Sequence, residues 1–114
     1  MKIFRRNEIN PFSVSDKVTF RNVDKTLTLT VRADASALVL GIKRANAHIS
    51  ALTDESTEAD TETAARLFSS VIFGEEQAAR LYDFYGNPLT VISVLGIYFR
   101  DRLAKKITKA QKRK

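Results

Sequence analysis

The chain has 114 residues, of which 44% are hydrophobic and 28% are charged, and its formal net charge is +6. This length fits one domain, and the composition is too apolar for a wholly disordered chain. The absence of cysteine excludes disulfide scaffolds, thiolate zinc sites and cysteine nucleophiles. Because the sequence contains no long apolar run, we expect neither a secretion signal nor a membrane span.

The first part of the chain predicts an irregular arm followed by a β-hairpin. Residues 1–16 lack a sustained hydrophobic period, whereas residues 17–32 alternate apolar and polar side chains around a turn at 22–25. An isolated hairpin is only marginally stable in water, so its apolar face must lie on helices or on a second chain. An uncovered edge would support self-association into a homo-oligomer. The expected buried face consists of Val18, Phe20, Leu27, Leu29 and Val31.

Four helices are expected after the hairpin, because apolar residues recur every three or four positions. Ser36 is the expected N-cap of the first helix, and Asn87 with Pro88 begins the fourth. The acidic, Thr-rich stretch at 54–62 separates the first two as a solvated linker or a frayed helix start. The predicted fold class is therefore α+β, mostly α, with one domain over 17–103. The predicted helices cover about residues 37–52, 61–73, 75–85 and 88–107.

Two glycines, Gly41 and Gly96, lie inside predicted helices. Each costs the helix roughly 1 kcal/mol relative to alanine. We expect both positions to be close crossings between helices, where the absence of a side chain offsets this cost.

The positive charge is concentrated at the C-terminal end of the chain. Residues 100–114 contain eight Lys or Arg residues and one Asp, so the rest of the chain is nearly neutral. We expect a basic tail at 104–114 that frays from the last helix. If this tail only solubilises the protein or caps the helix, its removal should leave the core folded. Such a tail can neutralise phosphates, but lysines also suit the end of a helix and keep a protein soluble. The candidate residues are Lys105, Lys106, Lys109, Lys112 and Arg113.

The residue inventory does not favour an enzyme. The single histidine, His48, has no further His or Cys with which to form a zinc or iron site, and glycine-rich phosphate loops are absent. Paired carboxylates at 54–55 and 75–76 lie in polar or helix-starting contexts, where solvation and the helix dipole account for them. We therefore predict no catalytic residue, no cofactor and no metal.

Aromatic residues supply the candidate partner-binding face. A small helical body is expected to bury most of its aromatic stripe and to leave part of it at an interface, because tyrosine is stable when half-buried. The candidate residues are Phe73, Tyr82, Tyr85, Tyr98 and Phe99.

Four sequence segments that follow the hairpin resemble a known family. The order of these segments is similar to that of the small tail assembly chaperones of long-tailed bacteriophages and prophages of Gram-positive bacteria. The resemblance covers residues 17–113. The segments are Ile72-Phe73-Gly74-Glu75-Glu76-Gln77-Ala78-Ala79, Leu81-Tyr82-Asp83-Phe84-Tyr85, Tyr98-Phe99-Arg100-Asp101-Arg102-Leu103 and Lys105-Lys106-Ile107-Thr108-Lys109-Ala110-Gln111-Lys112-Arg113.

The resemblance implies a non-enzymatic role in the cytoplasm of a bacterial host. Chaperones of this family coat the long tape-measure protein, keep it soluble and help tail-tube subunits polymerise around it. They leave before the tail is finished, so they are not retained in the mature virion. Many are also made in a longer form by a ribosomal frameshift. No binding residue of the family is assigned to a position in this chain.

Two other classes of protein fit the same residues. The first is a small basic nucleic-acid-binding accessory protein whose tail contacts phosphates. The second is a structural virion component, such as a connector or tail-terminator subunit, which would remain in the particle. The near-neutral charge of the domain makes nucleic acid the less favoured partner.

Overall fold

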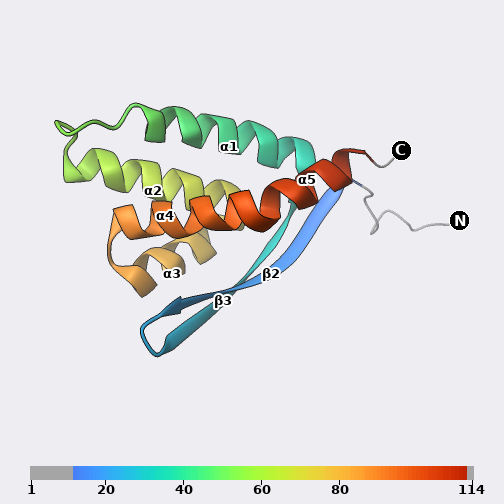
Figure 1. The fold of residues 1–114 in the computed structure, drawn as a ribbon, viewed down its shortest axis with the longest axis horizontal. Coiled ribbons are helices and arrows are strands. Elements are labelled where there is room, and N and C mark those ends of the chain that lie inside the picture. The colour runs from blue at the N-terminus through green and yellow to red at the C-terminus, as the bar shows by residue number, and fades with distance from the viewer. Residues whose placement is uncertain (1–11, 113–114) are drawn as a thin grey trace, which may run out of the picture.

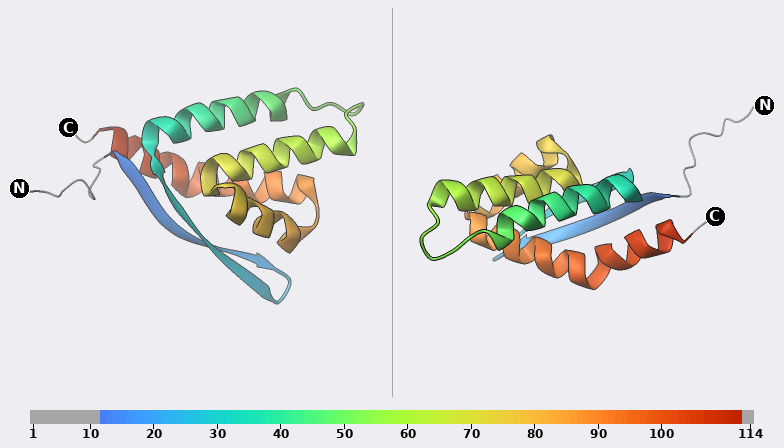
Figure 2. Two further views of the ribbon diagram at one scale, coloured as in Figure 1. Left: turned by 180° about the vertical axis from the view of Figure 1, so that it is seen from behind. Right: turned by 90° about the horizontal axis from the view of Figure 1, so that it is seen from above.

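The structure is a computed structural model that describes residues 12–112, in which a two-stranded antiparallel sheet packs against helices (Figure 1). The turn end of the hairpin projects past the helices in Figure 1, and the rear view on the left of Figure 2 shows the same. The predicted α+β class, with a hairpin followed by helices, is confirmed. The elements are β2 (Ser13–Asn22), β3 (Lys25–Asp34), α1 (Ala35–Ser50), α2 (Glu58–Phe73), α3 (Glu75–Tyr85), α4 (Pro88–Tyr98), the π-helical turn η1 (Phe99–Leu103) and α5 (Ala104–Gln111).

The core lies between the hairpin and the helices. Val18, Phe20, Leu29 and Val31 are buried and Leu27 is half-buried, which confirms the predicted apolar face of the hairpin. These side chains form one cluster with buried residues of every helix, and α2 contacts α1, α3 and α4. Among residues 12–112, none of the helices combines the length and apolarity that a membrane crossing requires.

The hairpin is longer than predicted, because β2 begins at Ser13. Residues 13–16, which the sequence places in an irregular arm, pair with residues 31–34 of β3. Asp16 occupies an inward-facing position and interrupts the apolar alternation, so the sequence pattern places the start of the strand too late, at residue 17. Residues 1–11 of the predicted arm lie outside the described residues. The buried positions of β2 are Val14, Asp16, Val18 and Phe20.

Side-chain caps determine where the first two helices begin. Asp34 caps α1 in place of the predicted Ser36, because its carboxylate accepts hydrogen bonds from the N–H groups of Ser36 (3.0 Å) and Ala37 (3.3 Å). α2 begins at residue 58 rather than 61, since Thr57 and Asp60 form a reciprocal capping box. The second half of the acidic stretch is therefore the first turn of a helix rather than a linker.

α4, η1 and α5 follow one another without a break, and we call them together the last helix. It contains one π-helical turn, η1, at residues 99–103. Asn87 and Pro88 begin this helix as predicted, and the Asn87 side chain accepts a hydrogen bond from the N–H of Leu89 at 2.9 Å. Up to Tyr98, successive buried residues are three or four positions apart, but the next buried residue, Leu103, comes five positions later. The wider turn accommodates the extra residue, so it returns Leu103 to the side that faces the core.

The C-terminal segment is helical to Gln111, which corrects the prediction of a fraying tail at 104–114. α5 contacts α1 and β2, and Ile107 and Ala110 are each only 5% exposed. The lysines dominate the composition of this segment, but two apolar residues one turn apart are enough to bury one side of a short helix. Arg113 lies outside the described residues.

Side chains of the helices occupy part of both edges of the hairpin. On β3, the Gln77 amide accepts a hydrogen bond from the Thr30 N–H (3.0 Å) and donates one to the Thr30 carbonyl (2.9 Å). On β2, the Tyr85 hydroxyl donates to the carbonyl of Arg21 at 2.9 Å. These bonds satisfy backbone groups that a further strand would otherwise pair with. Self-association through the edge remains a prediction, and it is restricted to the rest of each strand.

A buried carboxylate, Asp16, connects β2 to the last helix. The Tyr98 hydroxyl donates to Asp16 Oδ2 at 2.7 Å, and Arg102 Nη2 donates to Asp16 Oδ1 at 2.6 Å. Lys106 Nζ lies 3.8 Å from the same Oδ1 atom. Burial raises the pKa of Asp16, but the Tyr98 hydrogen bond and the charges of Arg102 and Lys106 outweigh this effect and hold the pKa below its ordinary value of 3.8.

Replacement of Asp16 tests this network. Asp16→Asn is expected to lower the free energy of unfolding by roughly 1–3 kcal/mol near neutral pH, because the amide cannot hold Tyr98 and Arg102 as an anion does. The folded-state pKa lies below the unfolded one, so the advantage of the wild type is present above about pH 4 and is lost as the pH falls further. Urea unfolding over this pH range measures both effects. Asp24→Asn, in the exposed turn, is the control, and a difference that does not change with pH would contradict the ionic network.

Replacement of Ile107 tests whether α5 is part of the core. Ile107→Ala is expected to lower the free energy of unfolding by about 2–5 kcal/mol, because it removes a buried side chain and leaves a cavity. Thr108→Ala, on the exposed side of the same helix, should change stability by less than about 0.5 kcal/mol. Urea unfolding compares the two variants, and equally small effects would mean that residues 104–114 are the solvated tail that the sequence predicts.

Candidate partner-binding groove

An apolar groove lies between α1 and the last helix. Its larger part has a volume of about 410 Å³, and its smaller part, of about 260 Å³, extends to α5. The two parts share Ile42, Lys43 and Phe99, so we treat them as one groove. The nonpolar residues of the larger part are Ile42 and Ile49 from α1, Phe68 from α2, and Ile92, Gly96 and Phe99 from the last helix.

The groove leaves apolar surface in contact with water. Phe68 is buried at 6% exposure, whereas Ile42, Ile49, Ile92 and Phe99 are only half-buried. Concave apolar surface with a few polar groups at its edge is typical of a binding site. The groove is therefore suited to hold an apolar partner.

The composition of α4 explains why one wall of the groove is apolar. Nearly every residue of this helix is apolar, but only one side of it can face the core. Val91 and Leu95 are fully buried, Ile92 lines the groove, and Leu89 and Ile97 are 62% and 51% exposed. An apolar surface around the whole helix is the signal that the sequence offered for this site, and the predicted stripes did not use it.

The two helical glycines have different surroundings. A Cβ atom on Gly41 would lie 2.8 Å from the Cβ of Val71, so the predicted helix crossing at Gly41 is confirmed, and the helix that it meets is α2. At Gly96 a Cβ atom would have no neighbour within 4 Å. The predicted crossing at Gly96 is therefore wrong, and this glycine instead leaves open space on the wall of the groove.

Two of the predicted partner-binding aromatics are part of the core. Phe73 and Tyr98 are 7% and 6% exposed, and their rings stack with centroids 6.3 Å apart. Phe20 of β2 meets both rings edge-on, at 5.9 Å and 6.4 Å. These aromatics attach the hairpin to the helices, so they do not belong to an exposed face.

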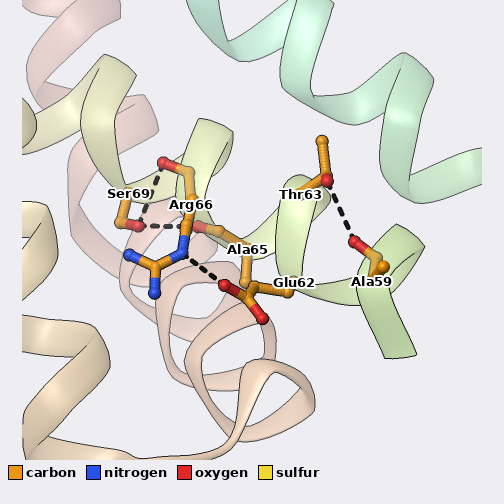
Figure 3. A network of polar contacts seen from close by, with 6 residues as sticks. All are labelled: Ala59, Glu62, Thr63, Ala65, Arg66 and Ser69. Atoms are coloured by element: carbon orange, nitrogen blue, oxygen red, sulfur yellow. Dashed lines mark hydrogen bonds and ion pairs between the residues drawn. The ribbon is translucent and has the colours of Figure 1, made fainter. Parts of the chain in front are cut away.

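The other three candidates, Tyr82, Tyr85 and Phe99, are half-buried. The Arg66 guanidinium lies 4.2 Å from the Tyr82 ring centre, and Glu62 holds this arginine through an ion pair of 2.8 Å (Figure 3). The Tyr85 hydroxyl is bound to the hairpin backbone. Of the five predicted residues, Phe99 is the one that lines the groove.

The predicted basic residues lie on two sides of α5. Lys106 faces Asp16, whereas Lys105, Lys109 and Lys112 border a shallow hollow together with Ala104 and Thr108. Ala104 and Thr108 also line the smaller part of the groove, so these three lysines flank it. We call them the basic ridge.

The buried polar groups are bound within the fold. The Ser69 hydroxyl is fully buried and donates to the carbonyl of Ala65 at 2.6 Å (Figure 3), and Asp16 is held as described above. Within residues 12–112 no group of three or more His, Cys, Asp or Glu side chains is arranged to hold a metal ion.

Comparisons of the chain with protein-family models, with curated proteins and with solved structures give no match.

The different surroundings of the two glycines predict opposite effects of alanine. Gly96→Ala is expected to raise the free energy of unfolding by about 1 kcal/mol, because it improves helix propensity and meets no neighbour. Gly41→Ala is expected to lower it by roughly 1–3 kcal/mol, because the new methyl group overlaps Val71. Urea unfolding of both variants measures the difference, and effects of the same sign would contradict this description of the groove wall.

Proposed function

We propose that the protein is a non-enzymatic assembly chaperone that binds helical segments of a bacteriophage tape-measure protein in the groove. The observation that carries the proposal is the half-buried apolar surface between α1 and the last helix. The class of partner comes from the resemblance of residues 17–113 to tail assembly chaperones. The bacterial cytoplasm is the compartment that this role requires.

The dimensions of the groove suit a helix of about three turns. The α1 residues that line it extend from Val39 to Ile49, a rise of roughly 15 Å along the helix axis. An amphipathic helix presents an apolar residue at every third or fourth position over this length, and such a stripe is what a helix-binding groove accepts. The groove would therefore cover one short section of a long helical partner.

Coverage of this kind explains how a small chain would keep a long protein soluble. A helical tape measure exposes an apolar stripe until tube subunits surround it, and exposed stripes associate in water. Because one groove covers only about three turns, several copies would be needed along the partner. Each copy would then be displaced individually as the tail-tube protein, the second proposed partner, polymerises. Displacement accounts for a chaperone that is not retained in the mature virion.

Filling the groove tests the proposal. The protein is co-expressed with the product of the very long coiled-coil reading frame that the proposed function places downstream of its gene, and co-purification and the soluble yield of that product are measured. Gly96→Leu should reduce the co-purified tape-measure protein by at least about tenfold, because the leucine occupies the open space where an apolar side chain of the partner would pack. Ser93→Leu, exposed on α4 but outside the groove, is the matched control and should leave binding unchanged.

Thermal unfolding of Gly96→Leu verifies that the variant is folded before binding is compared. If the tape-measure protein is equally soluble with and without the wild-type chain and never co-purifies with it, the proposed function is wrong. If both leucine variants bind as the wild type does, the groove is not the binding site.

A further inference from the structure

Cations border the groove on both walls, and carboxylates are nearly absent there. α1 and the last helix together carry seven Lys or Arg residues and one carboxylate, Asp101. That carboxylate pairs with the neighbouring Arg100 at 2.9 Å. The acidic residues of the domain lie mainly on α2, α3 and the α1–α2 connection.

The cations nearest the groove have no anionic partner within the described part of the chain. Arg102 and Lys106 are held by Asp16, and Arg100 by Asp101. Lys43 and the basic ridge form no ion pair with any carboxylate of residues 12–112. Their charges are therefore available to a partner.

These free cations lie on opposite sides of the groove. Lys43 of α1 lines both parts of it. The ridge residues Lys105 and Lys109 belong to α5 and adjoin the smaller part through Ala104 and Thr108. A helix bound along the groove would therefore meet a lysine on each side of its apolar stripe.

We propose that the groove selects an acidic amphipathic helix, in which Asp or Glu residues flank the apolar stripe on both sides. This inference rests on the proposed function and adds the charge of the segment that is bound. Carboxylates at the flanking positions pair with Lys43 and with the ridge, whereas a basic helix is repelled by them. Exposed pairs at the edge of an interface contribute to selection and to the association rate more than to affinity.

The same lysines can attract phosphate, but the groove favours a helix over nucleic acid. A duplex is bound through the charge of its phosphate backbone, and an apolar channel between the cations contributes nothing to such binding. Single strands are bound by stacking on aromatic side chains, and of the residues that line the groove Phe99 is the one half-buried aromatic, since Phe68 is buried. An apolar channel with a cation on each side fits a charged amphipathic helix.

Two synthetic helical peptides test the inference. They share one leucine stripe and differ only in the flanking positions, which are all Glu in one peptide and all Lys in the other. Fluorescence anisotropy at low salt is expected to show the Glu peptide binding about tenfold more tightly to the wild-type protein. This preference should shrink as the ionic strength approaches about 0.5 M, because salt screens exposed charges.

Charge reversal supplies the matched comparison. Lys43→Glu with Lys109→Glu is expected to abolish or invert the preference, because it places carboxylates on both sides of the groove. Arg44→Glu with Arg80→Glu changes the net charge equally at exposed positions outside the groove and should leave the preference unchanged. Equal responses of the two double variants would show that only net charge matters and would overturn the inference.

The remaining outcomes separate this inference from the proposed function. Equal affinity for both peptides, lost in Gly96→Leu, would overturn the charge selection while the groove still binds helices. Failure to bind either peptide, together with no co-purification of the tape-measure protein, would overturn the function itself. Tighter binding of a 20-base-pair DNA duplex than of the Glu peptide, lost in the Lys43 and Lys109 variant, would overturn the inference in favour of nucleic acid.

Discussion

The buried carboxylate of Asp16 fixes the position of the last helix on the hairpin. Its partners Tyr98 and Arg102 lie 82 and 86 residues further along the chain, so the contact closes the domain by joining its first strand to its last helix. The π-helical turn lets two neighbouring residues contact different parts of the fold: Leu103 faces the core while Arg102 reaches the carboxylate. The helix continues from this point as α5, whose placement beside α1 forms the smaller part of the groove.

The class of the fold was predictable from sequence because each element must bury one face. Apolar residues at every second position predicted the hairpin, and apolar residues at a period near 3.6 predicted the helices, since these spacings follow from backbone geometry alone. The predicted boundaries of the elements were wrong at two places, where a charged residue faces the core and where a basic segment is helical. Because of Asp16, the predicted strand began four residues too late. Because α5 is rich in lysine, the sequence predicted a solvated tail in its place. In both places the stabilising partner is remote in sequence, so no local pattern contains it.

The groove was harder to predict, because the same types of apolar residue occupy half-buried and fully buried positions, so the sequence does not distinguish them. Leu38 is fully buried and Ile42, one turn later on α1, lines the groove, yet both continue a single stripe. The adjacent Tyr98 and Phe99 were predicted together as partner-binding residues, but one is in the core and the other is in the groove. Whether an apolar residue lies in the core or in the groove depends on how α1 packs against the last helix. The apolar stripe of one helix does not show which part of it the neighbouring helices cover.

The Asp16 contact also determines which charges remain for a partner. Arg102 and Lys106 are four residues apart and lie on the side of the last helix that meets β2, where the carboxylate binds them. Lys105 and Lys109, also four apart, lie on the side that flanks the groove. The fold thus divides the basic residues of one helix into a set that stabilises the hairpin and a set that faces outward. At the groove, apolar surface adjoins Lys43 and the basic ridge, which form no ion pair with a carboxylate of residues 12–112.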